Sequence, residues 1–349
     1  MTSPRELAHK AEHALDKIKF RIKDKLNLFD PVILYPYRGY GNASIAYLPG
    51  RVLEKEHMIH DKEEDKDYTL WSNIRKVWKR YESDEIPGVE IEATLQGIKS
   101  RAVSDEEGYF HLKFDLTNLS LENGWHEVSL RIIDMPFDLE YEEETKAEIL
   151  INNETGRLAI ISDVDDTIIE SNAMNSLKKM KIMLTKSAKD RVAFEGVSKL
   201  YHALIKDYSN PLFFVSGSSY NLYDMLVSFC KAKDIPKAPL LLRNLGLEPE
   251  QWIKQDTSPY KIKHISHILD TYPSLNFVCI GDSGQQDPEI YLEINKRHPD
   301  RIKAIYIRHV DTDKRQDEIN KLNQDNKVPL VLIDHSEDII EHMKQNNLL

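Results

Sequence analysis

An apolar run that ends in two closely spaced carboxylates constrains this chain more than any other feature. Residues 158–162 read Leu-Ala-Ile-Ile-Ser, and Asp163 and Asp165 follow them. A short apolar run of this kind is typical of a strand buried in a parallel sheet. Residues i and i+2 of a strand face the same side, so both carboxylates would point into the crevice where open α/β sheets bind ligands. Such a pair can hold a divalent cation or act as nucleophile and general acid/base, and an exposed acidic turn is the alternative interpretation.

Three further signals follow in order along the chain. A second apolar run, Pro211–Val215, leads into Ser216–Ser219, whose hydroxyls suit hydrogen bonds to a phosphoryl oxygen. Lys261 lies at the start of an amphipathic segment. A third apolar run, Phe277–Ile280, leads into Gly281–Asp287, which holds another two carboxylates. The sequence therefore predicts polar groups at the ends of three strands.

The order of these signals resembles that of the haloacid dehalogenase-like phosphohydrolase superfamily over residues 155–335. The sequence around these signals is similar to that of the catalytic domain of the actin-patch-type phosphatidate phosphatases and their bacterial relatives. This closer similarity is carried by Ser162–Ile168, Leu240–Gly246, Gly281–Tyr291 and Ala304–Arg308. Upstream, Tyr37–Gly41 and Pro49–Val52 are similar to the bacterial members.

The resemblance implies Mg²⁺-dependent removal of the phosphate from phosphatidate, leaving diacylglycerol. Asp163 would form an aspartyl-phosphate, and Asp165 would protonate the leaving alkoxide and then deprotonate water. The implied metal ligands are Asp163, the backbone carbonyl of Asp165, Asp282 and, directly or in the outer shell, Asp287. The implied phosphate-binding residues are Thr167, Ser216, Gly217 and Lys261, with Lys263 as the alternative to Lys261.

Alternating strand and helix patterns predict an α/β, Rossmann-like domain over residues 153–349, with a parallel sheet and helices on both faces. Strands are expected at 158–163, 211–215, 239–242, 276–280 and 302–307, and helices near 196–207, 219–232, 261–271 and 287–297. These elements leave only about 25 residues, 171–195, for a cap, so the cap is minimal and the site open. An open site suits a bulky or interfacial substrate.

Basic residues mark candidate substrate contacts. Lys178 and Lys179 lie in the basic, apolar flap, which would either meet an anionic lipid or form an ordinary amphipathic helix with its lysines in water. Arg243 and Arg308 fall near strand ends and would contact a headgroup or form structural ion pairs.

The amino-terminal part has a different pattern. Residues 1–28 read as a basic amphipathic helix, which would lie on an anionic membrane or dock on the protein itself. Residues 29–152 predict a small antiparallel β-sandwich with strands at 44–48, 89–95, 109–114 and 126–133 and an inserted helix at 70–78. No carboxylate pair or His/Cys cluster of catalytic spacing occurs there, so we assign this part no chemistry.

Composition excludes several classes of protein. A net charge of −11 argues against general nucleic-acid binding, and no apolar run is long enough for a transmembrane helix. The first residues lack a signal-peptide core, so we expect a cytoplasmic protein, peripheral at a membrane if the basic segments bind lipid. Cys230 and Cys279 lie in apolar segments and are expected to be reduced core residues.

Two other functions remain open at this point. The same chemistry would serve a soluble or macromolecular phosphoester, which the response of activity to lipid vesicles would distinguish. A non-catalytic binding module with the same fold is disfavoured by the complete set of Asp163, Asp165, Ser216, Lys261 and Asp282.

Overall fold

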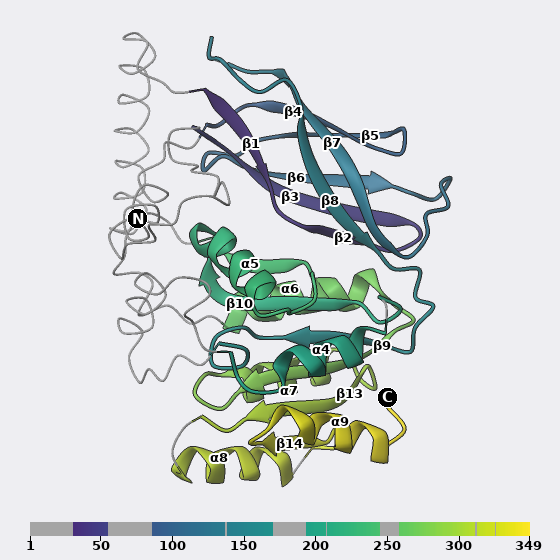
Figure 1. Cartoon of the computed structure of the whole chain (residues 1–349), viewed down its shortest axis with the longest axis vertical. Coiled ribbons are helices and arrows are strands. Elements are labelled where there is room, and N and C mark those ends of the chain that lie inside the picture. Colours follow the sequence, from purple (N-terminus) through teal and green to yellow (C-terminus); the bar gives the residue numbers. More distant parts are fainter. Residues whose placement is uncertain are drawn as a thin grey trace, which may run out of the picture.

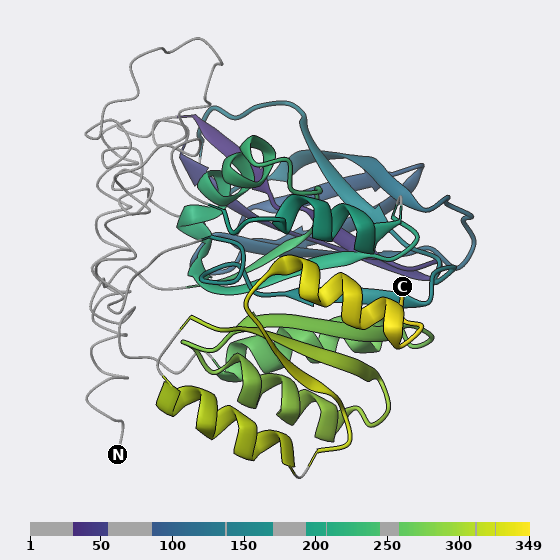
Figure 2. The same cartoon turned by 60° about the horizontal axis from the view of Figure 1, so that its bottom comes forward.

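The computed structural model describes residues 31–54, 86–136, 138–169, 193–206, 208–244, 258–310, 313–324 and 326–349. These residues form two sheets that lie side by side (Figure 1 and Figure 2). The expected helices at 1–28 and 70–78, and the flap with Lys178 and Lys179, lie outside the described residues. No described helix is both long and apolar enough to cross a bilayer.

The amino-terminal sheet is mixed and mostly antiparallel. Its strands are β1 (Val32–Pro36), β2 (Gly39–Gly41), β3 (Ile45–Glu54), β4 (Glu90–Leu95), β5 (Ile98–Val103), β6 (Tyr109–Asp115), β7 (Gly124–Asp134) and β8 (Thr145–Ile151). The order is β1-β3-β2-β8-β7-β4-β5, with β6 paired to β3. The expected strands at 44–48, 89–95, 109–114 and 126–133 are confirmed within β3, β4, β6 and β7.

This sheet wraps around a core of its own. Strand β3 pairs with β1, β2 and β6, so the sheet branches there. At the other end of the strand order, the Ser100 hydroxyl on β5 donates to the Lys113 carbonyl on β6 at 2.8 Å, which brings the far ends of the sheet together. Phe110, Phe114 and Leu48 are buried between the layers, as the alternating pattern of a half-buried strand requires.

The second sheet is parallel throughout. Its strands are β9 (Leu158–Ser162), β10 (Leu212–Ser219), β11 (Leu240–Arg243), β12 (Asn276–Asp282), β13 (Ile302–Arg308) and β14 (Leu330–Ile333), in the order β11-β10-β9-β12-β13-β14. The helices are α4 (Val197–Ile205), α5 (Tyr223–Ala232), α6 (Ser258–Thr271), α7 (Asp287–Arg297), α8 (Asp313–Gln324) and α9 (Ser336–Gln345). The predicted α/β class is confirmed.

Helices cover both faces of the parallel sheet. On the central strand β9, Leu158 and Ile160 pack with residues of α4, α5 and α9, whereas Ala159 and Ile161 pack with α6, α7 and α8. A strand buried on both faces explains why its sequence is continuously apolar rather than alternating. Cys230 and Cys279 are buried and unpaired, as expected.

In the parallel-sheet domain, the element boundaries differ most from the expected ones at two places. Strand β10 continues to Ser219 and is followed by a short 3-10 turn, Tyr220–Leu222, before α5 begins. Helix α6 begins at Ser258 rather than at Lys261, so Lys261 lies in its first turn. Helices α8 and α9 and strand β14 extend the alternation to the end of the described chain.

Candidate active site

Three buried carboxylates meet at the carboxyl ends of β9 and β12. Asp163 follows β9, Asp282 ends β12, and Asp287 begins α7. The two strands are neighbours, and the Asp163 amide donates to the Ile280 carbonyl at 2.9 Å. One oxygen from each carboxylate lies within 4.8 Å of the other two, and all three side chains are fully buried. The structure therefore brings together three of the sequence-predicted metal ligands.

Lys261 is the positive charge of this cluster. Its Nζ lies 2.7 Å from Asp163 Oδ1 and 2.6 Å from Asp287 Oδ1, and the residue is almost completely buried. Burial alone would lower the pKa of Lys261, but the two carboxylates outweigh it and raise the pKa above its usual value. Lys263, the alternative in the sequence, is exposed.

The cluster is short of positive charge. Three carboxylates face a single ammonium, which leaves two negative charges unbalanced when all of them are ionised. Burial raises the pKa of Asp163 to about 8, with Lys261 opposing and the Asp287 carboxylate adding to the effect. Asp163 Oδ2 is buried and has no hydrogen-bond partner among the described residues. A divalent cation would supply both the missing charge and the missing partner, so the residues fit a metal site.

Asp165 is held by two serine hydroxyls rather than by the cluster. Ser216 Oγ donates to Asp165 Oδ2 at 2.9 Å and Ser218 Oγ donates to the same oxygen at 2.8 Å. The Ser218 amide in turn donates to Ser216 Oγ at 3.0 Å, and Gly217 lies half-buried between the serines. Ser218 belongs to the hydroxyl run at the end of β10 but was not among the predicted site residues.

The turn after Asp165 carries another unpartnered polar atom. Asp166 has a positive φ of 58°, and its amide donates to the Ile169 carbonyl at 3.0 Å, which closes the turn. Thr167 is buried, and its Oγ1 has no hydrogen-bond partner among the described residues. A buried hydroxyl without a partner is costly unless a ligand completes it, which agrees with a phosphate-binding residue at this position.

The loop after β12 is fixed by hydrogen bonds to Asp282. Its Oδ1 accepts from the amides of Gly284 and Gln285 at 2.8 and 3.0 Å. Gln285 Nε2 donates to Asp282 Oδ2 at 3.1 Å and to the Asp165 carbonyl at 3.2 Å, so one side chain bridges two of the predicted metal ligands. An ideal Cβ on Gly281 would lie 2.5 Å from Asp287 Oδ2, so only glycine allows this close approach.

Arg315 on α8 fastens the same loop from outside. It donates to the carbonyls of Ser283 and Gln285, both at 3.0 Å, and forms a bidentate ion pair with Glu289. Sequence reasoning missed both Gln285 and Arg315. Gln285 stands in the quoted Gly-Asp-Ser-Gly-Gln run, but Arg315 lies in a charge-rich helix where no pattern distinguishes it.

Of the candidate substrate residues, the structure describes Arg243 and Arg308. Arg308 is buried and donates to the Thr167 carbonyl, the Asp334 carbonyl and Ser336 Oγ, so it ties the catalytic turn to the start of α9. These contacts give Arg308 a structural role through hydrogen bonds to uncharged groups, rather than through the expected ion pair. Arg243 is buried at the end of β11, in register with Ser219. Lys178 and Lys179 lie outside the described residues.

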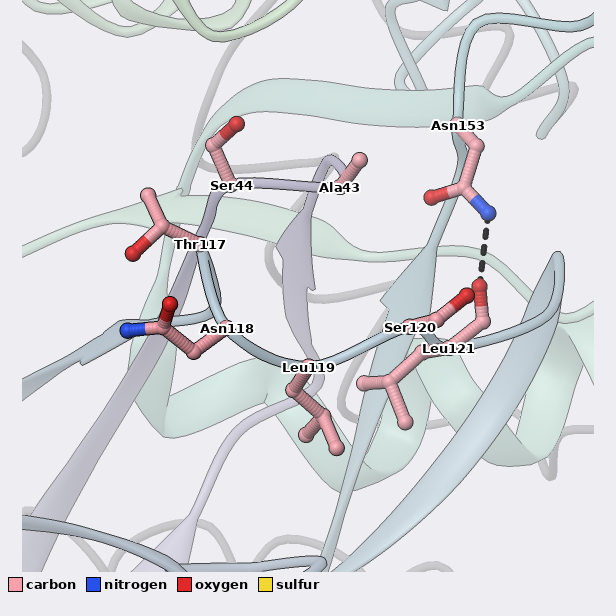
Figure 3. A pocket seen from close by; sticks show the side chains of 8 residues that line it. All are labelled: Ala43, Ser44, Thr117, Asn118, Leu119, Ser120, Leu121 and Asn153. Carbon is pink, nitrogen blue, oxygen red and sulfur yellow. Dashed lines mark hydrogen bonds between the residues drawn. The ribbon is translucent and has the colours of Figure 1, made fainter.

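A separate pocket lies at the far end of the amino-terminal sheet (Figure 3). It is formed by the β2–β3 turn, the β6–β7 connection and the segment after β8, with Ser44, Thr117 and Asn153 among its lining residues. Asn153 Nδ2 donates to the Leu121 carbonyl at 2.6 Å (Figure 3). None of its lining residues is charged, and it contains none of the residues of the carboxylate cluster.

Comparison with known proteins shows which family the site is similar to. Residues 158–309 match the family described as phosphatidate phosphatase APP1, catalytic domain. Phosphatidate phosphatase APP1 of Saccharomyces cerevisiae is 28% identical over 151 residues, which cover 43% of this chain and 26% of that protein. An uncharacterized protein of Schizosaccharomyces pombe is 25% identical over 240 residues, covering 66% of this chain and 39% of that protein. The chain thus spans well under half the length of these curated relatives.

Solved structures resemble the chain only weakly. A carbohydrate acetylesterase from Xanthomonas citri is 9% identical, with a TM-score of 0.33 over 84% of this chain and 66% of its own, which carries no argument about fold or function. The family match instead covers the segment that supplies the carboxylates, the serines and the lysine of the site. The similarity to the catalytic domain of phosphatidate phosphatase APP1 therefore covers residues 158–309, the part of the chain that holds the site.

Proposed function

We propose that this chain is a Mg²⁺-dependent phosphatidate phosphatase of the haloacid dehalogenase-like type. One observation carries the proposal. Asp163, Asp282 and Asp287 form a buried, charge-deficient cluster with Lys261, directly beside Asp165 and its two serine hydroxyls. A nucleophile, an acid/base and a cation site at one crevice are the groups that phosphate-ester cleavage requires.

Asp163 and Asp165 divide the covalent chemistry between them. A carboxylate oxygen of Asp163 attacks phosphorus, a P–O bond to the aspartate forms, and the P–O bond to the glycerol oxygen breaks. Asp165 gives its proton to the leaving alkoxide, which departs as the hydroxyl of diacylglycerol. Asp165 then takes a proton from water, which attacks the aspartyl-phosphate and releases inorganic phosphate. The serine hydroxyls on Asp165 Oδ2 aim the carboxylate, and the other oxygen carries the proton.

The remaining residues neutralise and orient the phosphoryl group. Lys261 offsets the charge of Asp163 as it approaches an anionic phosphate, and the unpartnered Thr167 hydroxyl donates to a phosphoryl oxygen. Ser216 and the Gly217 backbone line the same crevice. Mg²⁺, when bound, supplies electrostatic stabilisation of the developing charge. It would be held by Asp163, the Asp165 carbonyl, Asp282 and Asp287, with Gln285 keeping two of these together.

A lipid substrate agrees with the family and with the organisation of the chain. The yeast relative is described as a phosphatidate phosphatase. The short interval between the first two strands of the parallel sheet leaves room for only a minimal cap, which suits a substrate presented at a membrane. We assign residues 1–28 to a basic helix, 29–152 to the amino-terminal sheet and 153–349 to the catalytic domain of a cytoplasmic enzyme that acts peripherally at membranes.

A panel of phosphoesters, assayed with and without Mg²⁺, tests the proposal. Phosphatidate in vesicles should be hydrolysed to diacylglycerol and phosphate only with the cation, and faster than water-soluble monoesters at equal phosphate concentration. Equal turnover of soluble esters and vesicle lipid would leave a phosphatase but remove the lipid assignment. No turnover of any ester at saturating Mg²⁺ would overturn catalysis and favour a binding module.

A further inference from the structure

The amino-terminal sheet contacts the parallel-sheet domain next to Ser216 and Ser218, the serines that donate to Asp165. Ser216, Gly217 and Ser218 lie where the pairing of β10 is interrupted. The β9 register ends at Phe214, and the β11 register shifts between Val215 and Ser219. Regular strand pairing therefore does not position these three residues. Their position depends on what holds the chain immediately after them.

Aromatic contacts from the amino-terminal sheet hold that following segment. The ring of Tyr37 stacks on Tyr220, with centroids 4.2 Å apart and planes inclined by 26°. Tyr37 also lies 4.7 Å from the ring of Tyr223 at the start of α5, and it is buried within the core of the parallel sheet. Tyr109 on β6 approaches Tyr220 at 6.0 Å. Aromatic pairs at these distances are stabilised by ring electrostatics beyond their buried area.

Arg51 on β3 adds directional contacts to the same place. Its Nη1 donates to Asn221 Oδ1 at 3.4 Å, and its Nε donates to the Glu107 carbonyl at 3.0 Å. The guanidinium lies 4.6 Å from the centroid of the Tyr109 ring, and the residue is only 6% exposed. The Glu107 carboxylate accepts a hydrogen bond from Asn244, directly after β11. Arg51 thus contacts the segment after β10, and Glu107, which accepts a hydrogen bond from Arg51, contacts the residue directly after β11.

We propose that the amino-terminal sheet is part of the catalytic apparatus, with Arg51 and Tyr37 as positioning residues. They fix Tyr220 and Asn221, which in turn fix the irregular segment whose Ser216 and Ser218 hydroxyls aim Asp165. The proposal rests on the proposed function for the role of Asp165. Arginine suits this task because its planar fork donates in two fixed directions, whereas lysine is a flexible point donor. Displacing a catalytic group by about 1 Å can cost on the order of 100-fold in rate.

Three variants and one matched control test this role in the full chain. Arg51→Lys keeps the charge but loses the fork, Asn221→Ala removes its partner from the other side, and the double variant measures their coupling. The control is Asn42→Asp. Asn42 Nδ2 donates to the carbonyl of Thr271, the last residue of α6, at 2.6 Å. That hydrogen bond also joins the amino-terminal sheet to the parallel-sheet domain, but Thr271 lies about 15 Å along α6 from Lys261.

The expected result is a loss in kcat without a matching change in KM. On p-nitrophenyl phosphate with Mg²⁺, Arg51→Lys and Asn221→Ala should each lower kcat about 10-fold to 100-fold, with KM within about twofold of wild type. The double variant should be no slower than the worse single variant, because both break the same contact. Asn42→Asp should keep the wild-type kcat. Amide hydrogen exchange should become faster at residues 216–221 in the Arg51→Lys protein and remain unchanged there in the control.

The outcomes separate the inference from the proposed function. A wild-type protein inactive on every ester would overturn the proposed function, and hydrogen exchange would still decide whether Arg51 holds residues 216–221. With an active wild type, a kcat within twofold of wild type in both single variants would overturn the inference. An equal loss in Asn42→Asp would also overturn it, because general docking of the sheets would then be the cause. If Arg51→Lys does not fold, the kcat of Asn221→Ala decides whether the inference holds, because the Asn221 side chain is only half-buried and its loss should leave the fold intact.

Discussion

In the proposed mechanism Asp163 must carry a negative charge to attack phosphorus, yet it is completely buried. Burial raises the pKa of its carboxyl, and Lys261, the ammonium beside it, is shared with Asp287. A bound divalent cation would favour the ionised carboxylate through its own charge. We therefore expect the ionisation of Asp163 and the binding of the metal to be linked, so that protons are released when the cation binds.

Replacing Asp163 by asparagine tests its role as nucleophile. The amide keeps the shape of the side chain but cannot form the aspartyl-phosphate, so kcat should fall by about 10³-fold or more. Rapid quenching with labelled substrate should trap a phosphoprotein in the wild type and none in the variant. A variant that keeps more than about a tenth of the wild-type rate would reassign the nucleophile to Asp165.

Gly281 gives a second test at the scale of one atom. In Gly281→Ala the new Cβ would lie 2.5 Å from Asp287 Oδ2 and 2.6 Å from Asp287 Cβ, so the Asp287 side chain must shift from its present position. We expect Mg²⁺ affinity, measured by calorimetry, to fall at least about 10-fold, since magnesium demands near-ideal placement of its ligands. Unchanged affinity would remove Asp287 from the ligand set.

On the element scale, one carboxylate joins three strands of the amino-terminal sheet. Glu92 on β4 accepts from Lys99 and Arg101 on β5 and from Arg131 on β7, and its side chain is covered although the three cations are largely exposed. These hydrogen bonds lower the pKa of Glu92 from 4.5 to about 2. In the pH range between these values the unfolded chain takes up a proton that the folded chain does not bind.

The sign of the pH effect follows from that shift. The stability that Glu92 contributes is complete above pH 4.5 and is lost as the pH falls towards about 2. Glu92→Gln should therefore lower the melting temperature at pH 7, and its difference from wild type should shrink as the pH falls through this range. Thermal melts of the two proteins between pH 7 and pH 2.5 measure the difference in melting temperature and its change with pH. A difference that stays constant with pH would show that the network acts through packing rather than charge.

The elements of the catalytic half could be predicted because their signals are local. Apolar runs located β9, β10 and β12, and parallel pairing then brought Asp163, Asp282 and Asp287 together as expected. The 3-10 turn after β10 was missed: Ser219 Oγ caps it locally by accepting from the Asn221 amide, and Tyr37 stacks on its first residue, Tyr220.

Contacts between distant segments left no local signal. Gln285 reaches Asp165 across 120 positions in the chain, and Arg51 reaches Asn221 across 170. A single sequence shows which residue types can form such contacts, but not which of them meet. Thus the carboxylates were predictable from strand ends and Lys261 from the start of an amphipathic segment, while the residues that hold them were not.

At the scale of the whole molecule, the proposed lipid substrate requires contact with a membrane. If the basic segments form this membrane contact, binding to anionic vesicles should weaken as the salt concentration rises. Exposed charges are screened within about 8 Å at physiological ionic strength. Replacing Lys178, Lys179 and Lys181 by glutamine should reduce vesicle sedimentation and turnover of vesicle phosphatidate. Turnover of a soluble ester should stay nearly unchanged, since these lysines take no part in the proposed chemistry.

Deletion of residues 1–28 is the complementary measurement for this prediction. If the amphipathic helix lies on the membrane, the shortened protein should bind vesicles less tightly at low salt. Vesicle binding that neither change reduces would show that both basic segments are solvated or docked on the protein, and that the membrane is met by another surface.

On the ribosome, the first strand of the parallel sheet to emerge is its central one. Strand β9 ends at Ser162, but its neighbours β10 and β12 begin only at Leu212 and Asn276. Throughout that interval its five residues, all buried in the folded protein, lack both their strand partners and their covering helices. Such a segment is a target for chaperones and a hazard for aggregation. We therefore expect nascent chains that end between β9 and β10 to be the most dependent on chaperones, and chains that include β12 to be the first to resist proteolysis.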